Sequence, residues 1–504
     1  MFDGLGQLGS AFLGFMNPPT LFNVIWATFL GIVIGALPGL TATMGVALLT
    51  TLTFSMPHNE AIMVLICIYV GAIYGGSRSA ILLNIPGTPA SAASTLDGYP
   101  LARQGLAGRA MGISTSGSWL GTLFGILCLA LLTPVLSELA LTFQSFEFFW
   151  IAAFGVVVAG TLAGGDPLKG YIAGFLGLFI ATIGQEPYYN YQRFAFGFTD
   201  LAGGIGLLPA LVGAYGVAEV LQAMRGPAIK AVSSSIDSIV PRIEDVLKYW
   251  RTILRSGAIG VWIGILPGLG EDAAAWSSYA AARRASKEKE KFGRGSIEGL
   301  MAAETGEASS VPGAIIPVLT LALPGSAPAA VLMAAMMIHG LNPGPNLMLE
   351  SPQFFYQIIA MLVIADMSKL IFGFVLVRPL IKILLVPRER LMPIVFVLCV
   401  VGAYAITSRV FDIYVMLAFG LIGFVMRELK FNMAPLILGL VLGDLLEKNL
   451  TRGLVLSSGS LLPFFTRPVC AILSALTLIS IVWSVPAINS SVRNYLRRTL
   501  SRTA

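Results

Sequence analysis

Long apolar segments constrain this sequence more than any other feature. Windows of roughly 20 residues that are apolar enough to cross a bilayer as helices recur along the chain. One of them, at residues 148–164, reads FFWIAAFGVVVAGTLAG. Such a segment is apolar on every face, whereas the strands of a membrane barrel alternate polar with apolar residues. The sequence therefore predicts an all-α integral membrane protein with about 10 to 14 transmembrane helices.

The composition agrees with a membrane location. Hydrophobic residues make up 56% of the 504-residue chain and charged residues only 12%, compared with about a quarter charged in soluble domains. The net charge of +6 comes from basic residues in short loops between apolar segments, which indicates orientation in a membrane and not nucleic-acid binding. Four cysteines lie singly in apolar stretches without metal-type spacing. The first basic residue is Arg78, so no cleavable signal peptide is expected.

Two short motifs occur twice, more than two hundred residues apart. GIVIGALPGL at residues 31–40 returns as GVWIGILPGL at residues 260–269, with seven of ten positions identical. NIPGTPASA at residues 84–92 has a counterpart in ALPGSAPAA at residues 322–330. Each half of the chain therefore contains two apolar helices that are interrupted at a Pro-Gly pair.

The loops that follow these motifs carry opposite charge bias in the two halves. After the first break, residues 56–60 have no Lys or Arg, whereas residues 283–295 have six. After the second break the bias is reversed, with basic residues at 96–109 and none at 339–352. Because Lys and Arg collect in cytoplasmic loops, the swap predicts two repeats of inverted topology, as in many secondary transporters.

The repeat predicts the division of the chain. Residues 1–224 form the first inverted repeat, residues 225–255 a cytoplasmic or interfacial linker, and residues 256–504 the second repeat with a C-terminal helix. The N-terminus is expected outside and the basic C-terminus in the cytoplasm.

The matched breaks are the strongest indication of a binding site. A helix broken inside a bilayer is tolerated only where protein or a water-filled cavity satisfies its free backbone groups, and its freed N–H groups suit a carboxylate. We expect substrate binding by the breaks and their polar neighbours, namely Pro38, Gly39, Leu40, Thr41, Thr43, Arg78, Asn84, Pro86, Gly87, Thr88, Gly268, Gly270, Pro324, Gly325 and Ser326. The alternative is that the breaks only let neighbouring helices pack closely.

A coupling cation, Na⁺ or H⁺, is expected beside the same breaks. Freed carbonyl groups, hydroxyls and buried carboxylates can ligate Na⁺, and a carboxylate can also carry a proton. The candidate residues are Thr41, Asn84, Asp272, Glu304 and Ser326. Sodium is the only metal considered, and no organic cofactor is expected.

Several other ionisable residues lie in or beside apolar segments. Arg78 could bind a substrate carboxylate through its planar guanidinium, or it could pair with Glu304 or Glu307. Asp366 and Lys369, three residues apart on a helix, are expected to neutralise each other. The only two histidines, His58 and His339, lie at predicted loop edges and are expected to be structural.

Several catalytic signatures are absent from the sequence. It contains no G-x-x-x-x-G-K-[ST] phosphate loop, no H-E-x-x-H and no G-x-S-x-G motif. We therefore expect a secondary transporter and not an enzyme. A passive anion channel built from re-entrant hairpins is the alternative.

The same motifs resemble a known family, the large membrane subunit of the tripartite tricarboxylate transporters (TctA-like). The resemblance covers nearly the whole chain and includes GALPGLTATMGVALL, YVGAIYGG, AILLNIPGTPASAASTLDGYPLARQGLAGRAMG, IHGLNPGP and APLILGLVLGDLLEKNLTRGL. It implies that the paired Pro-Gly regions are Leu37 to Thr43, Asn84 to Ser91, Leu266 to Asp272 and Leu323 to Ala327. The chain departs from the family pattern at TGEASS, which contains Glu307, and at Arg78.

The resemblance also implies a function. It indicates a multi-pass protein of the bacterial inner membrane that imports an organic di- or tricarboxylate by cation symport, by an elevator-type alternating-access mechanism. The implied partners are a small membrane subunit of about four spans and an extracytoplasmic solute-binding protein. A homo-oligomer of the membrane complex is a further expectation.

Overall fold

Helices form almost all of the described chain. The computed structural model describes residues 2–37, 39–162, 166–186, 188, 190–224, 243–376, 379–380 and 388–484. Within these ranges the strands are limited to a short antiparallel pair, β1 (Gly184–Gln185) and β2 (Gln192–Arg193). The predicted helical class is confirmed.

The described helices belong to two compact units, and each unit combines segments from both halves of the sequence. Unit 1 contains Met1–Ala140 and Gly206–Val425, and unit 2 contains Leu141–Ile205 and Met426–Ala504. The predicted boundaries at residues 224 and 255 follow the sequence repeat and remain a prediction. Most of the predicted linker, residues 225–242, lies outside the described residues.

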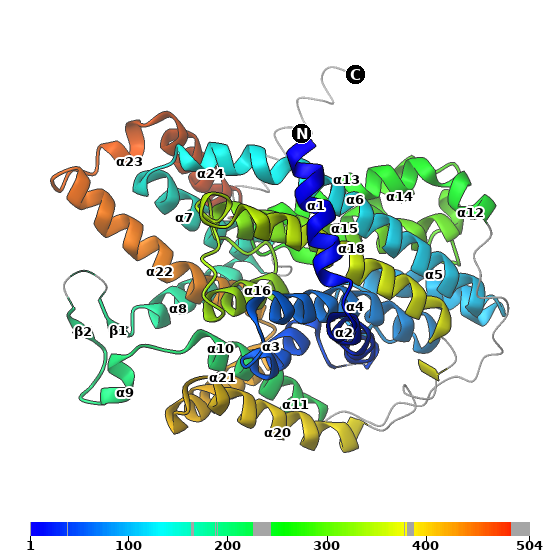
Figure 1. Cartoon of the computed structure of the whole chain (residues 1–504), viewed down its shortest axis with the longest axis horizontal. Helices are drawn as coiled ribbons and strands as arrows, with labels where there is room; N and C mark the ends of the chain where they lie inside the picture. The colour runs from blue at the N-terminus through cyan, green and yellow to red at the C-terminus, as the bar shows by residue number, and fades with distance from the viewer. Residues whose placement is uncertain are drawn as a thin grey trace, which may run out of the picture. The chain divides into compact units, whose positions relative to one another are not determined.

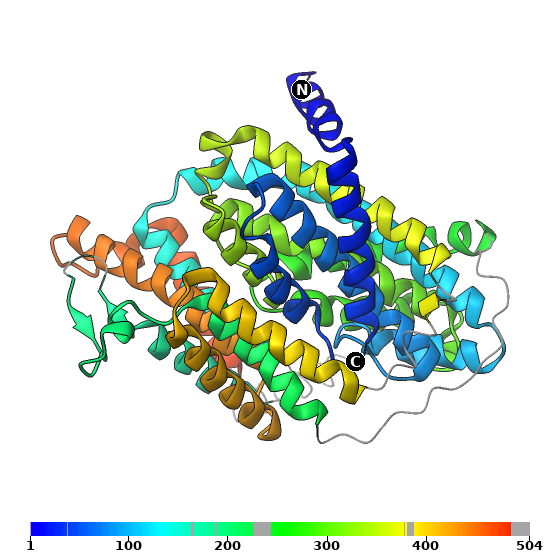
Figure 2. The same ribbon diagram turned by 60° about the horizontal axis from the view of Figure 1, so that its bottom comes forward.

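Unit 1 contains the four Pro-Gly regions. Its helices from the first half are α1 (Phe2–Phe15), α2 (Pro18–Ala36), α3 (Ala42–Thr53), α4 (His58–Leu83), α5 (Ala92–Arg103) and α6 (Ala107–Leu141). Its later helices are α10 (Leu207–Leu211), η1 (Val212–Val217), α11 (Ala218–Ala223), α12 (Ile243–Lys248), α13 (Trp250–Ile265), α14 (Gly270–Ala285), η2 (Lys289–Lys291), α15 (Ile297–Leu321), α16 (Ala327–Ile338), α17 (Leu347–Glu350), α18 (Pro352–Val375), α20 (Arg388–Thr407) and α21 (Val410–Glu428). Figure 2 shows α1 extending beyond the end of α2.

Unit 2 is smaller and contains long apolar helices packed on one another. Its helices are α7 (Ser145–Leu162), α8 (Pro167–Ala181), α9 (Thr199–Ala202), α22 (Met433–Leu456), α23 (Pro463–Thr466) and α24 (Pro468–Ser484). Helix α22 packs along α8 and α7 (Figure 1). A Cβ atom at Gly439 would meet the backbone of α8 at Gly174 and Gly177, so these helices approach through small residues.

Five helices of the described chain are long and apolar enough to cross a membrane. They are α2, α4, α6, α18 and α21, and several further apolar helices are shorter. The shorter ones include α3 and α16, which follow the Pro-Gly regions. The expected total of about 10 to 14 spans remains a prediction.

Two helix pairs in unit 1 pack in the same way. Helix α2 packs along α4 (Figure 1), and α13 packs along α15. Gly35 of α2 lies against the backbone of Ala72, and Gly264 of α13 lies against the backbone of Ser310 and Gly313. Glycine at these points lets the helix backbones approach closely, which a side chain would prevent.

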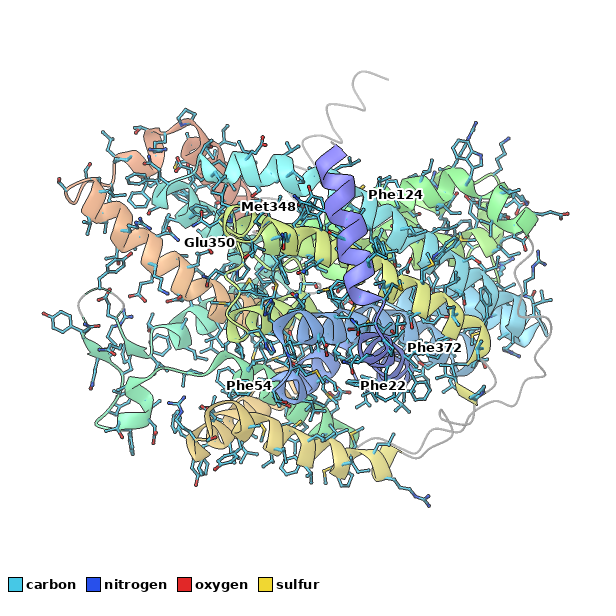
Figure 3. All side chains as sticks on the ribbon, in the orientation of Figure 1. Phe22, Phe54, Phe124, Met348, Glu350 and Phe372 are labelled. Atoms are coloured by element: carbon cyan, nitrogen blue, oxygen red, sulfur yellow. The ribbon has the colours of Figure 1, made fainter. Side chains whose placement is uncertain are left out.

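Side chains from other parts of unit 1 close the space around α2. Helix α18 packs against both α2 and α4. Figure 3 labels Phe372 on α18 and Phe22 on α2, and Phe372 packs against the ring of Phe29 with centroids 6.3 Å apart. This aromatic contact joins α18 to α2.

Candidate transport site

The helix before each first break ends at the same position of the repeated motif. Helix α2 ends at Ala36 and α13 at Ile265, and both are followed by an extended residue, Leu37 or Leu266. Both copies then contain a tight turn, in which Leu40 N–H donates to Leu37 O at 3.0 Å and Leu269 N–H donates to Leu266 O at 3.4 Å. Pro38 lies outside the described residues.

Glycines occupy backbone conformations in these turns that other residues adopt poorly. Gly39 has φ +97° and Gly268 has φ +81°, both in the left-handed region that favours glycine. Gly268 N–H also donates to Gly325 O at 3.0 Å, which ties the first break of the second half to its second break. In both copies, the positive φ of the turn therefore explains why glycine follows proline.

The second breaks also share their geometry. Helix α4 ends at Leu83 and is followed by Asn84 with φ +57°, and α15 ends at Leu321 and is followed by Ala322 with φ +56°. Both helices therefore stop at a left-handed residue. Gly87 N–H then donates to Gly76 O at 3.2 Å, and Gly325 N–H donates to Ala314 O at 3.4 Å. The chain folds back on its own helix in both halves.

Glycine is required at the second breaks for steric reasons. A Cβ atom at Gly87 would overlap the carbonyl oxygen of Gly35, and one at Gly325 would overlap that of Gly264. In each half the second break therefore lies directly on the first broken helix. The predicted residues Gly87 and Gly325 are thus brought close to the first breaks.

Hydroxyl side chains hold the segments that follow the breaks. Thr41 accepts from Met44 N–H at 3.2 Å at the start of α3, and Ser326 accepts from Ala329 N–H at 3.3 Å at the start of α16. Thr88 is at the position equivalent to Ser326 and accepts from Ser91 N–H at 3.4 Å. Thr41, Thr88 and Ser326 therefore act as caps or turn residues at three of the four breaks.

A buried polar cluster joins side chains of the two sequence halves. The Tyr69 hydroxyl on α4 donates to the carboxylate of Glu271 in the first turn of α14, and it lies 2.8 Å from Ser326 Oγ at the start of α16. Glu271 is 4% exposed and Ser326 is 2% exposed. The sequence indicated Ser326, but Tyr69 was missed because a tyrosine in an apolar helix has no distinguishing pattern.

Arg78 is fully buried and binds neutral groups. Its guanidinium donates to Met111 O at 3.1 Å, to Thr115 Oγ1 at 3.4 Å and to Ser114 Oγ, and it stacks on the Tyr74 ring at 4.2 Å from the centroid. Within the described residues it forms no ion pair. The alternative pairing with Glu304 or Glu307 is therefore not seen.

Three other buried ionisable residues are paired or hydrogen-bonded, and Glu307 is not. Lys369 Nζ lies 2.6 Å from Asp366 Oδ1 and donates to Thr122 Oγ1 at 2.8 Å, so the predicted pair is confirmed. Glu304 accepts from Ser94 Oγ at 2.7 Å across to α5. Neither carboxylate oxygen of Glu307 has a hydrogen-bond partner.

The remaining candidates are distributed over buried and exposed positions. Thr43, Gly87, Thr88, Gly325 and Ser326 are buried, as are Arg78 and Glu304. Asn84 and Asp272 are exposed. The structure thus brings the breaks of each half together, while the binding roles of all these residues remain predictions.

Two sets of contacts connect loops from different sequence halves. Gln104 Nε2, after α5, donates to Arg294 O in the loop before α15 at 3.0 Å. Asp97 of α5 accepts from the N–H groups of Gly293, Gly295 and Ser296 in that loop at 2.8–2.9 Å. Elsewhere, Thr53 Oγ1 at the end of α3 lies 3.5 Å from His339 Nε2 at the end of α16.

A cavity opens beside the second of these contacts. Its volume is about 410 Å³, and its lining includes His58, Asn59, Leu341, Glu350 and Ser351. Figure 3 labels Glu350 in this region. Burial, together with the nearby charge of His58, lowers the pKa of His339 below its ordinary value.

Comparison with known proteins identifies the family. The sequence model of the tripartite tricarboxylate transporter TctA family matches residues 21–438. This chain belongs to the TctA family. The matched region includes all four Pro-Gly regions and the buried cluster of Tyr69, Glu271 and Ser326.

Two similar proteins come from Agrobacterium vitis. An uncharacterised 52.8 kDa protein in the TAR-I ttuC' 3' region is 35% identical over 483 residues, which cover 95% of this chain and 96% of that protein. An uncharacterised protein in the TAR-II ttuC' 3' region is 33% identical over 232 residues, covering 46% of this chain and 96% of that protein. No solved structure matches this TctA-family chain.

Proposed function

We propose that this chain is the large transmembrane subunit of a binding-protein-dependent secondary transporter that imports an organic di- or tricarboxylate by cation symport. Membership of the TctA family supports a tricarboxylate-transporter membrane subunit. The observation that carries the rest is the pair of matched breaks in unit 1, with buried ionisable side chains from both sequence halves beside them. Broken helices in corresponding places of two repeats are a common setting for transported substrates and ions.

Inverted orientation of the two halves is part of this proposal. In the structure, the end of α3 contacts the end of α16, whereas α5 contacts the loop between α14 and α15. In each pair, the two contacting loops have the same charge bias. The first pair, residues 56–60 and 339–352, has no Lys or Arg, whereas the second pair is basic. Loops that share a charge bias and lie together support one extracytoplasmic and one cytoplasmic face.

Transport would use the breaks as follows. The N-termini of α3, α5, α14 and α16 present backbone N–H groups that suit a carboxylate, and the carboxylates and hydroxyls beside them suit a cation. Alternating exposure of the two ligands to the two faces would couple their movement. We assign this movement to an elevator-type mechanism in the bacterial inner membrane, with a small membrane subunit and an extracytoplasmic solute-binding protein as partners.

Gradient-driven uptake tests the proposed function. Proteoliposomes would contain this chain with the small membrane subunit, and the solute-binding protein would be added outside with labelled citrate, succinate or malate. An imposed Na⁺ or H⁺ gradient is expected to concentrate at least one of these carboxylates inside. Uptake that only equilibrates across the membrane would instead indicate a passive anion pore, because a pore cannot concentrate its solute.

Variants at the breaks separate a binding role from a packing role. We expect Ser326→Ala to reduce uptake, since it removes a hydroxyl that contacts both Tyr69 and the start of α16. Ser10→Ala, on the exposed side of α1, is the matched control. Asn84→Gly retains the left-handed backbone and removes only the amide, so wild-type uptake by it and by Ser326→Ala would show that the breaks serve packing alone.

A further inference from the structure

Glu307 differs from the other buried acids in unit 1. It lies in the middle of α15 and is 1% exposed, and neither of its carboxylate oxygens has a hydrogen-bond partner. By contrast, Glu304 accepts from Ser94 and Glu271 accepts from Tyr69. Asp366 also accepts no hydrogen bond, but it forms an ion pair with Lys369, which Glu307 lacks. An ionisable side chain inside a membrane protein is expensive to keep and usually has a function.

The charges around Glu307 do not compensate it. The charged groups that act on it are Glu304 on its own helix, Glu271 and Asp272 on α14, and Arg78 on α4. Arg78, the single cation among them, donates from Nη1 and Nη2 to Met111, Ser114 and Thr115, whereas its Nε–H has no hydrogen-bond partner. Glu307 therefore faces three acids and one cation that forms no ion pair with it.

Charged groups on the other helices packed against α15 are engaged away from Glu307. Asp97 on α5 binds the loop at Gly293–Ser296 and accepts from Tyr279. On α13, Arg255 contacts Thr252 near the start of α15, where Thr252 donates to Glu298. Helix α16 has no charged residue. Helix α6 also packs along α15, and its one basic residue, Arg109, pairs with Asp245. Arg283 and Arg284 lie in the last turn of α14, near the loop before α15. Among the groups that act on Glu307, Arg78 is the positive one.

The wider cluster has more acids than bases. Four buried acids, Glu271, Glu304, Glu307 and Asp366, share this region with two buried bases, Arg78 and Lys369. Full ionisation would leave a net negative charge in a medium that penalises an isolated charge heavily. The region therefore requires added positive charge, and the carboxylate with no partner is the one that needs it most.

A proton meets this need better than a sodium ion. Hard metal cations bind several oxygen ligands at once, and sodium sites in transporters are formed by converging carbonyl, hydroxyl and carboxylate oxygens. The Glu307 oxygens accept no hydrogen bond from the described residues. A proton requires no coordination shell, because one O–H bond converts the carboxylate into a neutral acid.

We propose that Glu307 carries the proton that couples carboxylate transport in this protein, a role that rests on the proposed symport. The proton comes from water on the side of lower pH and forms an O–H bond with one carboxylate oxygen. It returns to water on the other side when that bond breaks. The protein is then an H⁺-coupled and not a Na⁺-coupled transporter.

Infrared spectroscopy tests the protonation directly and does not depend on transport. Wild-type protein in lipid at neutral pH is expected to show the C=O stretching band of a protonated carboxyl group. Glu307→Gln, which has the shape of the neutral acid, is expected to lose that band, whereas Glu290→Gln on the exposed loop keeps it. No difference between wild type and Glu307→Gln would overturn the proposal.

Transport by the same proteins tests coupling. With the membrane potential clamped, a pH gradient of one unit is expected to drive about tenfold accumulation per proton in wild type. Glu307→Gln is expected to give an accumulation ratio of about 1 while still exchanging internal for external labelled carboxylate. Retained exchange shows that this variant is folded and binds substrate.

Three results would overturn either the role of Glu307 or the proposed function. A wild type driven by a Na⁺ gradient alone would keep the proposed function and overturn the role of Glu307. A wild type that moves no citrate, succinate or malate under either gradient would overturn the proposed function itself. Accumulation by Glu307→Gln under a pH gradient would also overturn the proton-carrying role.

Discussion

At the scale of single residues, Tyr69 shows how much depends on one hydroxyl. It donates to Glu271 and lies 2.8 Å from Ser326 Oγ, so it connects α4 with the starts of α14 and α16. All three side chains are buried, and water cannot replace a lost bond there. The cluster therefore fixes the positions of two helix starts that follow breaks.

Removal of this hydroxyl should destabilise the protein. We expect Tyr69→Phe to lower the free energy of unfolding by about 1–3 kcal/mol, because it leaves the Glu271 carboxylate without its donor. Thermal unfolding in detergent measures the change. Tyr414→Phe is the control, since Tyr414 is 64% exposed; equal melting temperatures for the two variants would contradict the role given to Tyr69.

His339 should make the stability of the protein depend on pH. Burial lowers its folded-state pKa below the ordinary 6.5, so the unfolded chain binds more protons in this range. Stability then rises with pH, and this contribution is lost as pH falls through the ordinary value toward the folded-state pKa. We expect His339→Gln to melt with less acid sensitivity than wild type between about pH 7.5 and 5.5. An unchanged pH dependence would contradict this.

The sequence predicted side-chain contacts correctly where the two partners are close together in the sequence. Asp366 and Lys369 are one helical turn apart, so their pairing follows from spacing alone, and the structure confirms it. The contacts of Arg78 with Met111 and Ser114 depend on how α4 packs against α6, which no local pattern encodes. The same limit explains why Tyr69 was missed and why Glu307 could not be distinguished from Glu304.

At the scale of elements, the helix ends were the most predictable feature. The Pro-Gly motifs predicted interruptions at two places in each half, and α2, α4, α13 and α15 end there. The ends follow from local backbone chemistry, since Gly39 and Gly268 have positive φ. The start of α14 was less predictable, because Gly270 takes the place where Thr41 caps α3 in the first half.

Close packing of the breaks should make their glycines intolerant of a methyl group. We expect Gly325→Ala to lower the free energy of unfolding by about 1–3 kcal/mol, because its Cβ atom would overlap the Gly264 carbonyl oxygen. Gly9→Ala on α1, where nothing lies within 4 Å of the added Cβ, is the matched control. Thermal unfolding of both variants checks this, and equal stability would show that the contact at Gly325 is not tight.

At the scale of the whole molecule, the repeat and the compact units divide the chain differently. The sequence repeat separates residues before and after the predicted linker, whereas each compact unit takes segments from both sides of it. The units are determined by contacts between segments that are distant in sequence. Such contacts cannot be predicted from a local sequence pattern. Within unit 1, four helices end at the Pro-Gly motifs, and the inverted relation of the two repeats remains a prediction.

The whole proposal depends on the opposed orientation of the two halves in the membrane. This orientation can be tested by measuring on which side of the membrane four loops lie. Single cysteines would replace Ser55 and Asn342, in the loops that lack basic residues, and Gln104 and Glu290, in the basic loops; all four positions are exposed. In intact cells, a membrane-impermeant maleimide is expected to label positions 55 and 342, and to label positions 104 and 290 only after the membrane is opened. Labelling of positions 55 and 290 from the same side of the membrane would contradict the inverted repeats and, with them, the proposed transport site at the breaks.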